Sequence, residues 1–451
     1  MNNPSFAARR SDELELLAGR LDGARMMRAY LQERIARHLA VTERVEDERL
    51  AAPVDVESIA RWQQALRRRL NSAIGGLPEA RTPLNARTVA VVPRAGFRVE
   101  KVIHESSPGV YVTALLFLPD DPRFEPPYPA VLVACGHVRH GKADEASQRG
   151  SALAAHHGLA ALLVDPIDQG ERFHLLDDDD NPHLWSGLAH NALGVGSIPL
   201  GKNPARFIIH DLIRSLDYLQ QRSDIDGDRL GVMGNSGGGT QTALLTAVDD
   251  RIKAAAPSCY ITSFERLVHT LGPQDSEQNI FGQLAFGLDH AGFLTMRAPV
   301  PVMVCAATDD YFDIEGTRRS VQRTRRVFEA LGHPEHLALT EATGPHGWHR
   351  PLREASVRWM TRFLRAVDEP APEPDDLEVL TERESRVTEH GQVMRCAGAV
   401  SLFDLNARRA QQMARHAEAR WAAVGTEHAL GEIRELLDVD RLHELPEPEL
   451  E

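Results

Sequence analysis

The sequence has few of the features that mark disulfide-rich, membrane or nucleic-acid-binding proteins. It holds four cysteines in 451 residues, and their spacing matches neither a zinc site nor a redox pair. No stretch approaches the roughly 18 consecutive apolar residues of a transmembrane helix, and the start, MNNPSFAARRSDELELL, lacks the apolar core of a secretory signal. The net charge of −14 disfavours a nucleic-acid backbone or an anionic membrane as partner. We expect a cytoplasmic, globular protein, with secretion only if a signal peptide has been removed.

The N-terminal part has a helical pattern. Apolar residues within 59–73 recur at three- and four-residue steps, which predicts an amphipathic helix, and those within 27–35 do the same. Gly75 and Gly76 predict the end of the second helix. We therefore expect a helical N-terminal region over 1–94 that serves packing or oligomerisation, so that a homo-oligomer would form through the helical termini.

From about residue 95 onwards, short apolar runs alternate with helical segments. FRVEKVIHE and VYVTALLFLP, separated by turn residues, predict a pair of strands. Most of the later strand-like runs, PAVLVACGH, LAALLVDPI, RLGVMGNS, IKAAAPSCY, PVPVMVCAATDD and HLALTEA, are separated by helical stretches. Such alternation predicts a doubly wound, mostly parallel sheet covered on both faces. The predicted fold class is α/β, with the catalytic domain over 95–367.

Two stretches interrupt this alternation. Residues 171–203 and 261–297 are too long for plain connections, and both follow predicted strand ends, where α/β sheets bind ligands. We interpret them as cap or specificity insertions. Beyond residue 367, the run EPAPEPDD predicts a linker and NARRAQQMARHAEARW predicts a charged helix. Residues 368–451 are thus expected to form a linker and a helical C-terminal tail.

A candidate nucleophile lies in the run Gly-Asn-Ser-Gly-Gly at 234–238. The strand-like RLGVM leads into it and the helical GGTQTALLTAV leads out, which is the context of a nucleophile elbow. Glycines flank the serine in such a turn because a Cβ would clash with the neighbouring strand and helix. A phosphate-binding turn is the alternative, but the G-x-G-x-x-G and Walker patterns are absent. We predict that Ser236 is the nucleophile.

A catalytic serine needs a base and an acid that orients the base. In this fold the chain order is serine, acid, histidine. Asp310 has the expected spacing after the strand PVPVMVCAA, although Asp309 and Asp313 remain alternatives. His346 is flanked by Gly and Pro in the loop after HLALTEA, and His349 is its rival.

Other site residues follow from position alone. The backbone N–H groups of Gly237 and His137 are expected to form the oxyanion hole. Trp348, beside the predicted base, and Tyr260 and Phe264, at the second insertion, are substrate-binding candidates. His137 has no partner ligand at a recognisable spacing. We therefore expect no metal and no organic cofactor.

The order of these elements resembles the α/β-hydrolase superfamily, in particular its acetylxylan-esterase-like and dienelactone-hydrolase-like branch. The resembling pieces are PAVLVACGH, VDPIDQGER, DLIRSLDYL, GVMGNSGGG, AATDDYFDIEG and GPHGW, which span about 97–367. The resemblance implies a carboxylic-ester hydrolase with Ser236, Asp310 and His346 as its triad. One departure is that dienelactone hydrolases carry Cys at the elbow, where this chain has Ser.

These inferences lead to an expected function. We expect a serine esterase that acts on small short-chain esters, such as acetylated sugars, through an acyl-enzyme. One alternative is an aminopeptidase or oligopeptidase on the same fold, although the first 95 residues are too few for the propeller that such enzymes normally carry. The other alternative is a catalytically silent binding module.

Overall fold

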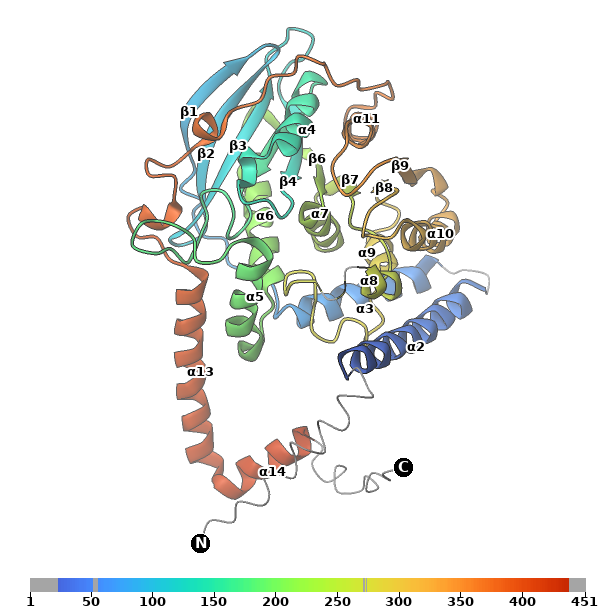
Figure 1. The fold of residues 1–451 in the computed structure, drawn as a ribbon, viewed down its shortest axis with the longest axis vertical. Helices are drawn as coiled ribbons and strands as arrows, with labels where there is room; N and C mark the ends of the chain where they lie inside the picture. Colours follow the sequence, from blue (N-terminus) through green and yellow to red (C-terminus); the bar gives the residue numbers. More distant parts are fainter. Residues whose placement is uncertain (1–22, 52–55, 271, 273, 438–451) are drawn as a thin grey trace. The chain divides into compact units, whose positions relative to one another are not determined.

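The computed structural model describes residues 23–51, 56–270, 272 and 274–437. Within them, nine strands form one sheet in the order β1-β2-β3-β5-β4-β6-β7-β8-β9 (Figure 1). The strands are β1 (Arg87–Arg94), β2 (Phe97–Ser107), β3 (Val110–Pro119), β4 (Tyr128–Ala134), β5 (Ala160–Val164), β6 (Ile225–Asn235), β7 (Ile252–Ser258), β8 (Val302–Ala307) and β9 (Leu337–Ala342). Strands β1 to β3 are antiparallel, β3 pairs antiparallel with β5, and the other pairs are parallel.

Helices alternate with the parallel strands. The α-helices are α2 (Gly23–Ala51), α3 (Val56–Ala73), α4 (Glu145–His156), α5 (Ser186–Ser197), α6 (Pro204–Gln220), α7 (Gly237–Val248), α8 (Phe264–Thr270), α9 (His290–Thr295), α10 (Ile314–Ala330), α11 (Arg350–Arg365), α12 (Glu382–Ser385), α13 (Leu402–Val424) and α14 (Thr426–Leu436). No described helix combines the length and apolar character needed to cross a membrane. The predicted α/β class, with a mostly parallel sheet, is confirmed.

The sheet separates two hydrophobic cores. Strand β3 shows why, because Leu115 and Leu116 are both fully buried but point to opposite faces and belong to different cores. One core contains residues of α4 and α11, and the other contains residues of α3, α6, α7 and α10. The strands between β3 and β8 are therefore covered on both sides, as their continuous apolar runs predict.

The N-terminal region is helical only in its first part. In α3 the predicted apolar stripe packs inward, and Ile59, Leu66 and Leu70 are buried. In α2, Met27 and Leu31 are exposed, whereas Ile35 and the buried Leu39 pack against the core, so only the later part of that helix faces the domain. Residues 87–94, which the sequence analysis included in the helical region, form strand β1. The run RTVAVVPR is rich in β-branched residues and pairs with β2, which explains the strand.

The segment that follows α11 differs from the expected linker. Ala371, Leu377 and Leu380 are buried in the core that contains α4 and α11. The Glu373 carboxylate is 2.6 Å from the Arg353 guanidinium of α11. The Pro- and acid-rich composition suggested a solvated linker, but apolar residues at intervals within it allow the segment to pack on the domain.

The chain divides into two compact units, one ending at Ala399 and the other beginning at Val400. In the second unit α13 includes the predicted charged helix, and it begins with a capping box formed by Ser401 and Asp404. The sequence-based boundaries near residues 94 and 367 stay predictions. The packing of residues 371–380 groups that stretch with the sheet domain.

A buried ionic network fixes the loop that follows β4. Lys142 Nζ lies 2.6 Å from Asp165 Oδ2 and 2.6 Å from Glu171 Oε1, and the Lys142 side chain is 2% exposed. Burial lowers the pKa of Lys142, but the two carboxylates outweigh this effect and raise it. Glu171 also accepts hydrogen bonds from the backbone N–H groups of Val387 and Thr388. The network thus joins the β4 loop, the first insertion and the segment after α12.

We expect Lys142→Met to destabilise the protein by about 3–5 kcal/mol, because it leaves two buried carboxylates without their cation. The free energy of unfolding, measured by denaturant titration, tests this expectation. Arg61→Met is the control, since the Arg61 and Glu57 side chains are 62% and 79% exposed and such pairs contribute about 0–1 kcal/mol. Equal costs for the two variants would contradict the structural role of the network.

Candidate active site

The elbow that carries Ser236 has a strained backbone. Ser236 has φ 61° and ψ −122° and lies between β6 and α7, which lifts its side chain above the sheet edge. The flanking glycines are required by space. A Cβ on Gly234 would lie 2.4 Å from the Ala134 carbonyl oxygen, and one on Gly238 would lie 2.0 Å from it. The elbow geometry expected from the sequence is therefore present.

The predicted acid–base pair is formed. His346 Nδ1 lies 2.9 Å from Asp310 Oδ1 and 2.8 Å from Oδ2. The Asp310 side chain is 1% exposed, whereas that of His346 is 21% exposed. Asp310 thus fixes the ring from its buried side and leaves the other edge of the imidazole accessible.

The rival residues have structural roles. Asp309 is exposed. Asp313 caps α10 by accepting a hydrogen bond from the Gly316 N–H. His349 Nε2 contacts the carbonyl oxygen of Pro345 at 2.7 Å, and this histidine precedes α11 as its N-cap. Among the three aspartates, Asp310 is the one that contacts His346, and its role as the catalytic acid stays a prediction.

Tyr311 is a site residue that the sequence analysis missed. Its ring stacks on His346 with centroids 4.4 Å apart. Burial raises the pKa of Tyr311 to about 12, while a hydrogen bond with Ser236 acts in the opposite direction. Among the contacts of the described residues, no hydrogen bond joins Ser236 to His346. A tyrosine next to the predicted acid was the available signal, but only the fold shows that it reaches the serine.

The loop after β4 lies against the elbow. A Cβ on Gly136 would be 3.2 Å from Ser236 Cβ. Gln169 Nε2 donates hydrogen bonds to the carbonyl oxygens of Gly136 at 2.6 Å and Val138 at 2.7 Å. The Gly136 carbonyl and the His137 N–H belong to the same trans peptide and therefore point in opposite directions. Since Gln169 binds the carbonyl, the His137 N–H points away from Gln169. Gln169 was also missed, since it lies in a separate loop.

The three substrate-binding candidates are buried instead of lining the site. Trp348 is 3% exposed, and its ring fills the space beside Gly150 in α4. Tyr260 is 1% exposed and stacks on His290 with centroids 4.7 Å apart. Phe264 is 7% exposed and packs edge-on against the same ring. Their large apolar surfaces explain the burial, so the expectation that they contact substrate is wrong.

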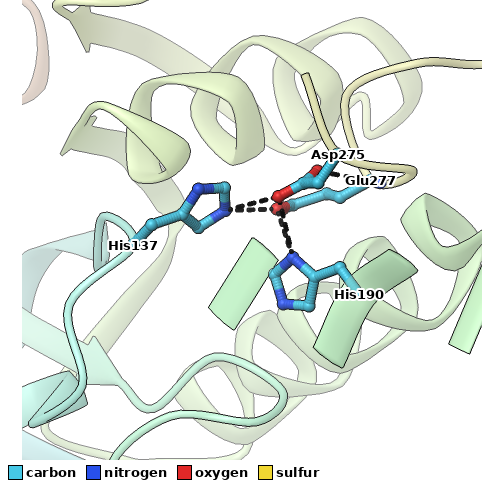
Figure 2. A group of neighbouring side chains, drawn as sticks. All are labelled: His137, His190, Asp275 and Glu277. Atoms are coloured by element: carbon cyan, nitrogen blue, oxygen red, sulfur yellow. Dashed lines mark hydrogen bonds and ion pairs between the residues drawn. The ribbon is translucent and has the colours of Figure 1, made fainter. Parts of the chain in front are cut away.

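Four polar side chains meet beside the elbow (Figure 2). His137 Nε2 lies 2.8 Å from Glu277 Oε2 and 3.5 Å from Asp275 Oδ2. His190 Nδ1 lies 3.3 Å from each of the same carboxylate oxygens. Burial alone would lower the pKa of His190, but hydrogen bonds to Asp275 and Glu277 raise it well above its ordinary value. A Cβ on Gly237 would lie 2.7 Å from His137 Nε2, so the cluster adjoins the residue that follows Ser236.

The sheet order, the elbow and the helices on both faces define the α/β-hydrolase fold. Residues 202–316 match the model of the prolyl oligopeptidase family. The protein is also similar to YtaP of Bacillus subtilis (strain 168), which is described as a hydrolase. The two are 24% identical over 322 residues, which cover 66% of this chain and 98% of YtaP.

Solved structures with this fold include several esterases. Methylesterase BT1017 superposes with a TM-score of 0.63 at 20% identity, covering 86% of this chain and 80% of its own. A Bacteroides fragilis protein named as an acetyl xylan esterase has a TM-score of 0.53 at 18% identity, with coverage of 63% and 76%. A glucuronoyl esterase from Solibacter usitatus has a TM-score of 0.50 at 16% identity, with coverage of 66% and 91%.

Proposed function

We propose that this protein is a serine hydrolase of carboxylic esters. The observation that supports this most is the joint placement of Ser236 on a strained elbow and the His346–Asp310 pair, with the ring of Tyr311 stacked on His346. The esterase names of the structural neighbours agree with the proposal.

The proposed reaction proceeds through an acyl-enzyme. Ser236 Oγ attacks the ester carbonyl while His346 Nε2 takes its proton, and Asp310 accepts the Nδ1–H and stabilises the imidazolium. For this step the Ser236 hydroxyl turns towards His346 Nε2, a contact that is absent among the hydrogen bonds of the described residues. The proton then passes to the departing alcohol, and water activated by His346 releases the acid and regenerates the serine.

The oxyanion would be held by the backbone N–H groups of Gly237 and His137. Gly237 is the first residue of α7, so its N–H has no acceptor within the helix, and the helix dipole favours negative charge there. Among the described hydrogen bonds, the His137 N–H donates to no acceptor. Both donors are therefore available beside Ser236.

We expect a preference for short acyl groups. Two other aromatic residues of the second insertion do not carry this expectation, because Phe281 is 79% exposed and Phe293 is buried. The support comes from the immediate neighbours of Ser236, which are Tyr311 and the His137 loop. Acetyl and propionyl esters should exceed octanoyl esters in kcat/KM by at least about tenfold, or about 1.4 kcal/mol.

A panel of 4-nitrophenyl acetate, propionate, butyrate and octanoate, with peptide 4-nitroanilides beside it, measures this preference. Equal or faster turnover of the octanoate would contradict the short-acyl preference. Faster turnover of the anilides would favour an oligopeptidase-type activity, the alternative that the match over 202–316 supports. Absence of labelling by a serine-reactive phosphonate would favour a silent binding module.

Tyr311→Phe tests whether the tyrosine hydroxyl restrains the Ser236 hydroxyl before substrate binds. The variant keeps the ring that stacks on His346 and removes the hydroxyl, whose pKa is raised by burial and lowered by hydrogen bonding with Ser236. A hydrogen bond contributes about 0.5–1.5 kcal/mol, so we expect phosphonate labelling of Ser236 to become roughly 2- to 12-fold faster. A tenfold slower reaction would instead mean that the hydroxyl stabilises the transition state.

A further inference from the structure

We propose that His137, His190, Asp275 and Glu277 form a binding site for one divalent transition-metal ion of the Zn²⁺ class, next to the elbow. The four side chains come from the loop after β4, from α5 and from the loop between α8 and α9 (Figure 2). One ligand atom from each lies within 4.8 Å of the other three. Mixed imidazole and carboxylate donors suit Zn²⁺ and Co²⁺.

The four separations between imidazole nitrogens and carboxylate oxygens are close to those around a tetrahedral ion. Four atoms placed about 2.0–2.1 Å from Zn²⁺ at tetrahedral angles lie about 3.3–3.4 Å apart. In the structure His190 Nδ1 is 3.3 Å from both carboxylate oxygens, and His137 Nε2 is 3.5 Å from that of Asp275. The contact between His137 and Glu277 is 2.8 Å, so His137 would move outward by a few tenths of an ångström.

The tautomer of His190 gives independent support. Its Nε2 lies 3.1 Å from the carbonyl oxygen of Ile167, which can only accept, so Nε2 carries a hydrogen. Nδ1 is then the ring nitrogen that faces the two carboxylate oxygens, and a bound cation would take the place of the Nδ1 proton between them. A backbone carbonyl that fixes the distal nitrogen is also the usual outer partner of a metal-bound histidine.

The burial and charge of the cluster point the same way. The His190 and Glu277 side chains are 0% exposed and that of Asp275 is 6% exposed, whereas His137 is 22% exposed and gives an ion a route of entry. Glu277 Oε1 is buried and has no hydrogen-bond partner. Two buried carboxylates carry a charge of −2, which one divalent ion neutralises.

Metal binding to the full-length chain tests the proposal without any substrate. After treatment with a chelator, the protein is titrated with ZnCl₂ in competition with a chromophoric chelator, and the bound metal is counted by mass spectrometry. We expect about one equivalent per chain. Glu277→Gln and His190→Gln should each weaken binding at least about 100-fold, because each removes a ligand.

Two control variants separate this site from other candidate clusters. One of these clusters is formed by His333, Glu335 and His336, of which the first two are exposed. The other is formed by Cys259, Asp310 and His346. Zinc binding should therefore survive both the double substitution His333→Gln/His336→Gln and the single substitution His346→Gln. Binding of Zn²⁺ at unchanged affinity by Glu277→Gln, or less than about 0.1 equivalent in the parent chain, would overturn the proposal.

Cobalt gives a readout that needs no variant. Co²⁺ in a tetrahedral site absorbs visible light far more strongly than Co²⁺ in an octahedral one, so the parent chain loaded with Co²⁺ should show intense bands that Zn²⁺ abolishes. Weak octahedral bands only would contradict the geometry proposed here. Neither measurement involves ester hydrolysis, so the metal site and the esterase proposal can fail separately.

Discussion

Ser236→Ala should lower kcat/KM for a short-chain ester by at least about 10⁴-fold, because the hydroxyl is the proposed nucleophile and the residual rate would come from binding and the oxyanion donors alone. Alanine keeps the Cβ of serine, so the backbone strain at φ 61° is unchanged. The melting temperature should consequently match that of the parent chain. Initial rates with 4-nitrophenyl acetate, together with phosphonate labelling, measure the effect.

The matched control is Ser258→Ala. Ser258 ends β7, and its backbone carbonyl accepts a hydrogen bond from the Ser236 N–H at 2.9 Å, a contact that alanine retains. Among the described residues, its hydroxyl has one hydrogen-bond partner, Cys259 Sγ at 3.8 Å, so activity should stay within about fivefold of the parent. Retention of near-parent turnover by Ser236→Ala would refute the proposed mechanism.

Asp310→Asn should be the next most damaging substitution, with a loss of kcat of roughly 10³–10⁴-fold. The carboxylate accepts the Nδ1–H of His346 and leaves Nε2 free to take a proton. An amide can instead donate to Nδ1, which favours the tautomer with hydrogen on Nε2, and that tautomer cannot act as a base. The fold should persist because Asn and Asp have the same shape.

Asp309→Asn is a sharp control for this prediction because the two aspartates are neighbours in sequence and differ in environment. Asp309 is exposed, while the Asp310 side chain is 1% exposed against His346. The Asp309 variant should keep its activity within about threefold. Comparable losses for both variants would indicate that general loop disruption, not the tautomer, causes the effect.

The sequence predicts the features that local patterns determine. The elbow follows from Gly234, Ser236 and Gly238, since no other residue type fits the space that the strand and helix leave. The strands and helices of residues 97–365 follow from the spacing of apolar residues, which repeats every two residues in a strand and every 3.6 residues in a helix. Asp310 could be chosen because the acid lies at a fixed distance from the end of β8.

Features that depend on long-range packing were not predictable. Glu277 and His137 are 140 residues apart and lie in loops without regular spacing, so the ligand set of the cluster appears only when the sheet is assembled. Trp348 was misjudged for the same reason. Its place beside the predicted base suggested a pocket wall, whereas the fold offers its ring the space beside Gly150.

The burial of Glu171 has a consequence for how the chain can be shortened. Its carboxylate receives the N–H groups of Val387 and Thr388 and also the Thr388 hydroxyl at 2.6 Å. In a chain that stopped after α11, Lys142 would be the remaining side-chain partner of this carboxylate among the described residues, and Lys142 lies in the same loop as His137. A shortened version of the sheet domain, or its transfer into another protein, would therefore require residues up to Thr388, beyond the end of α11 at Arg365.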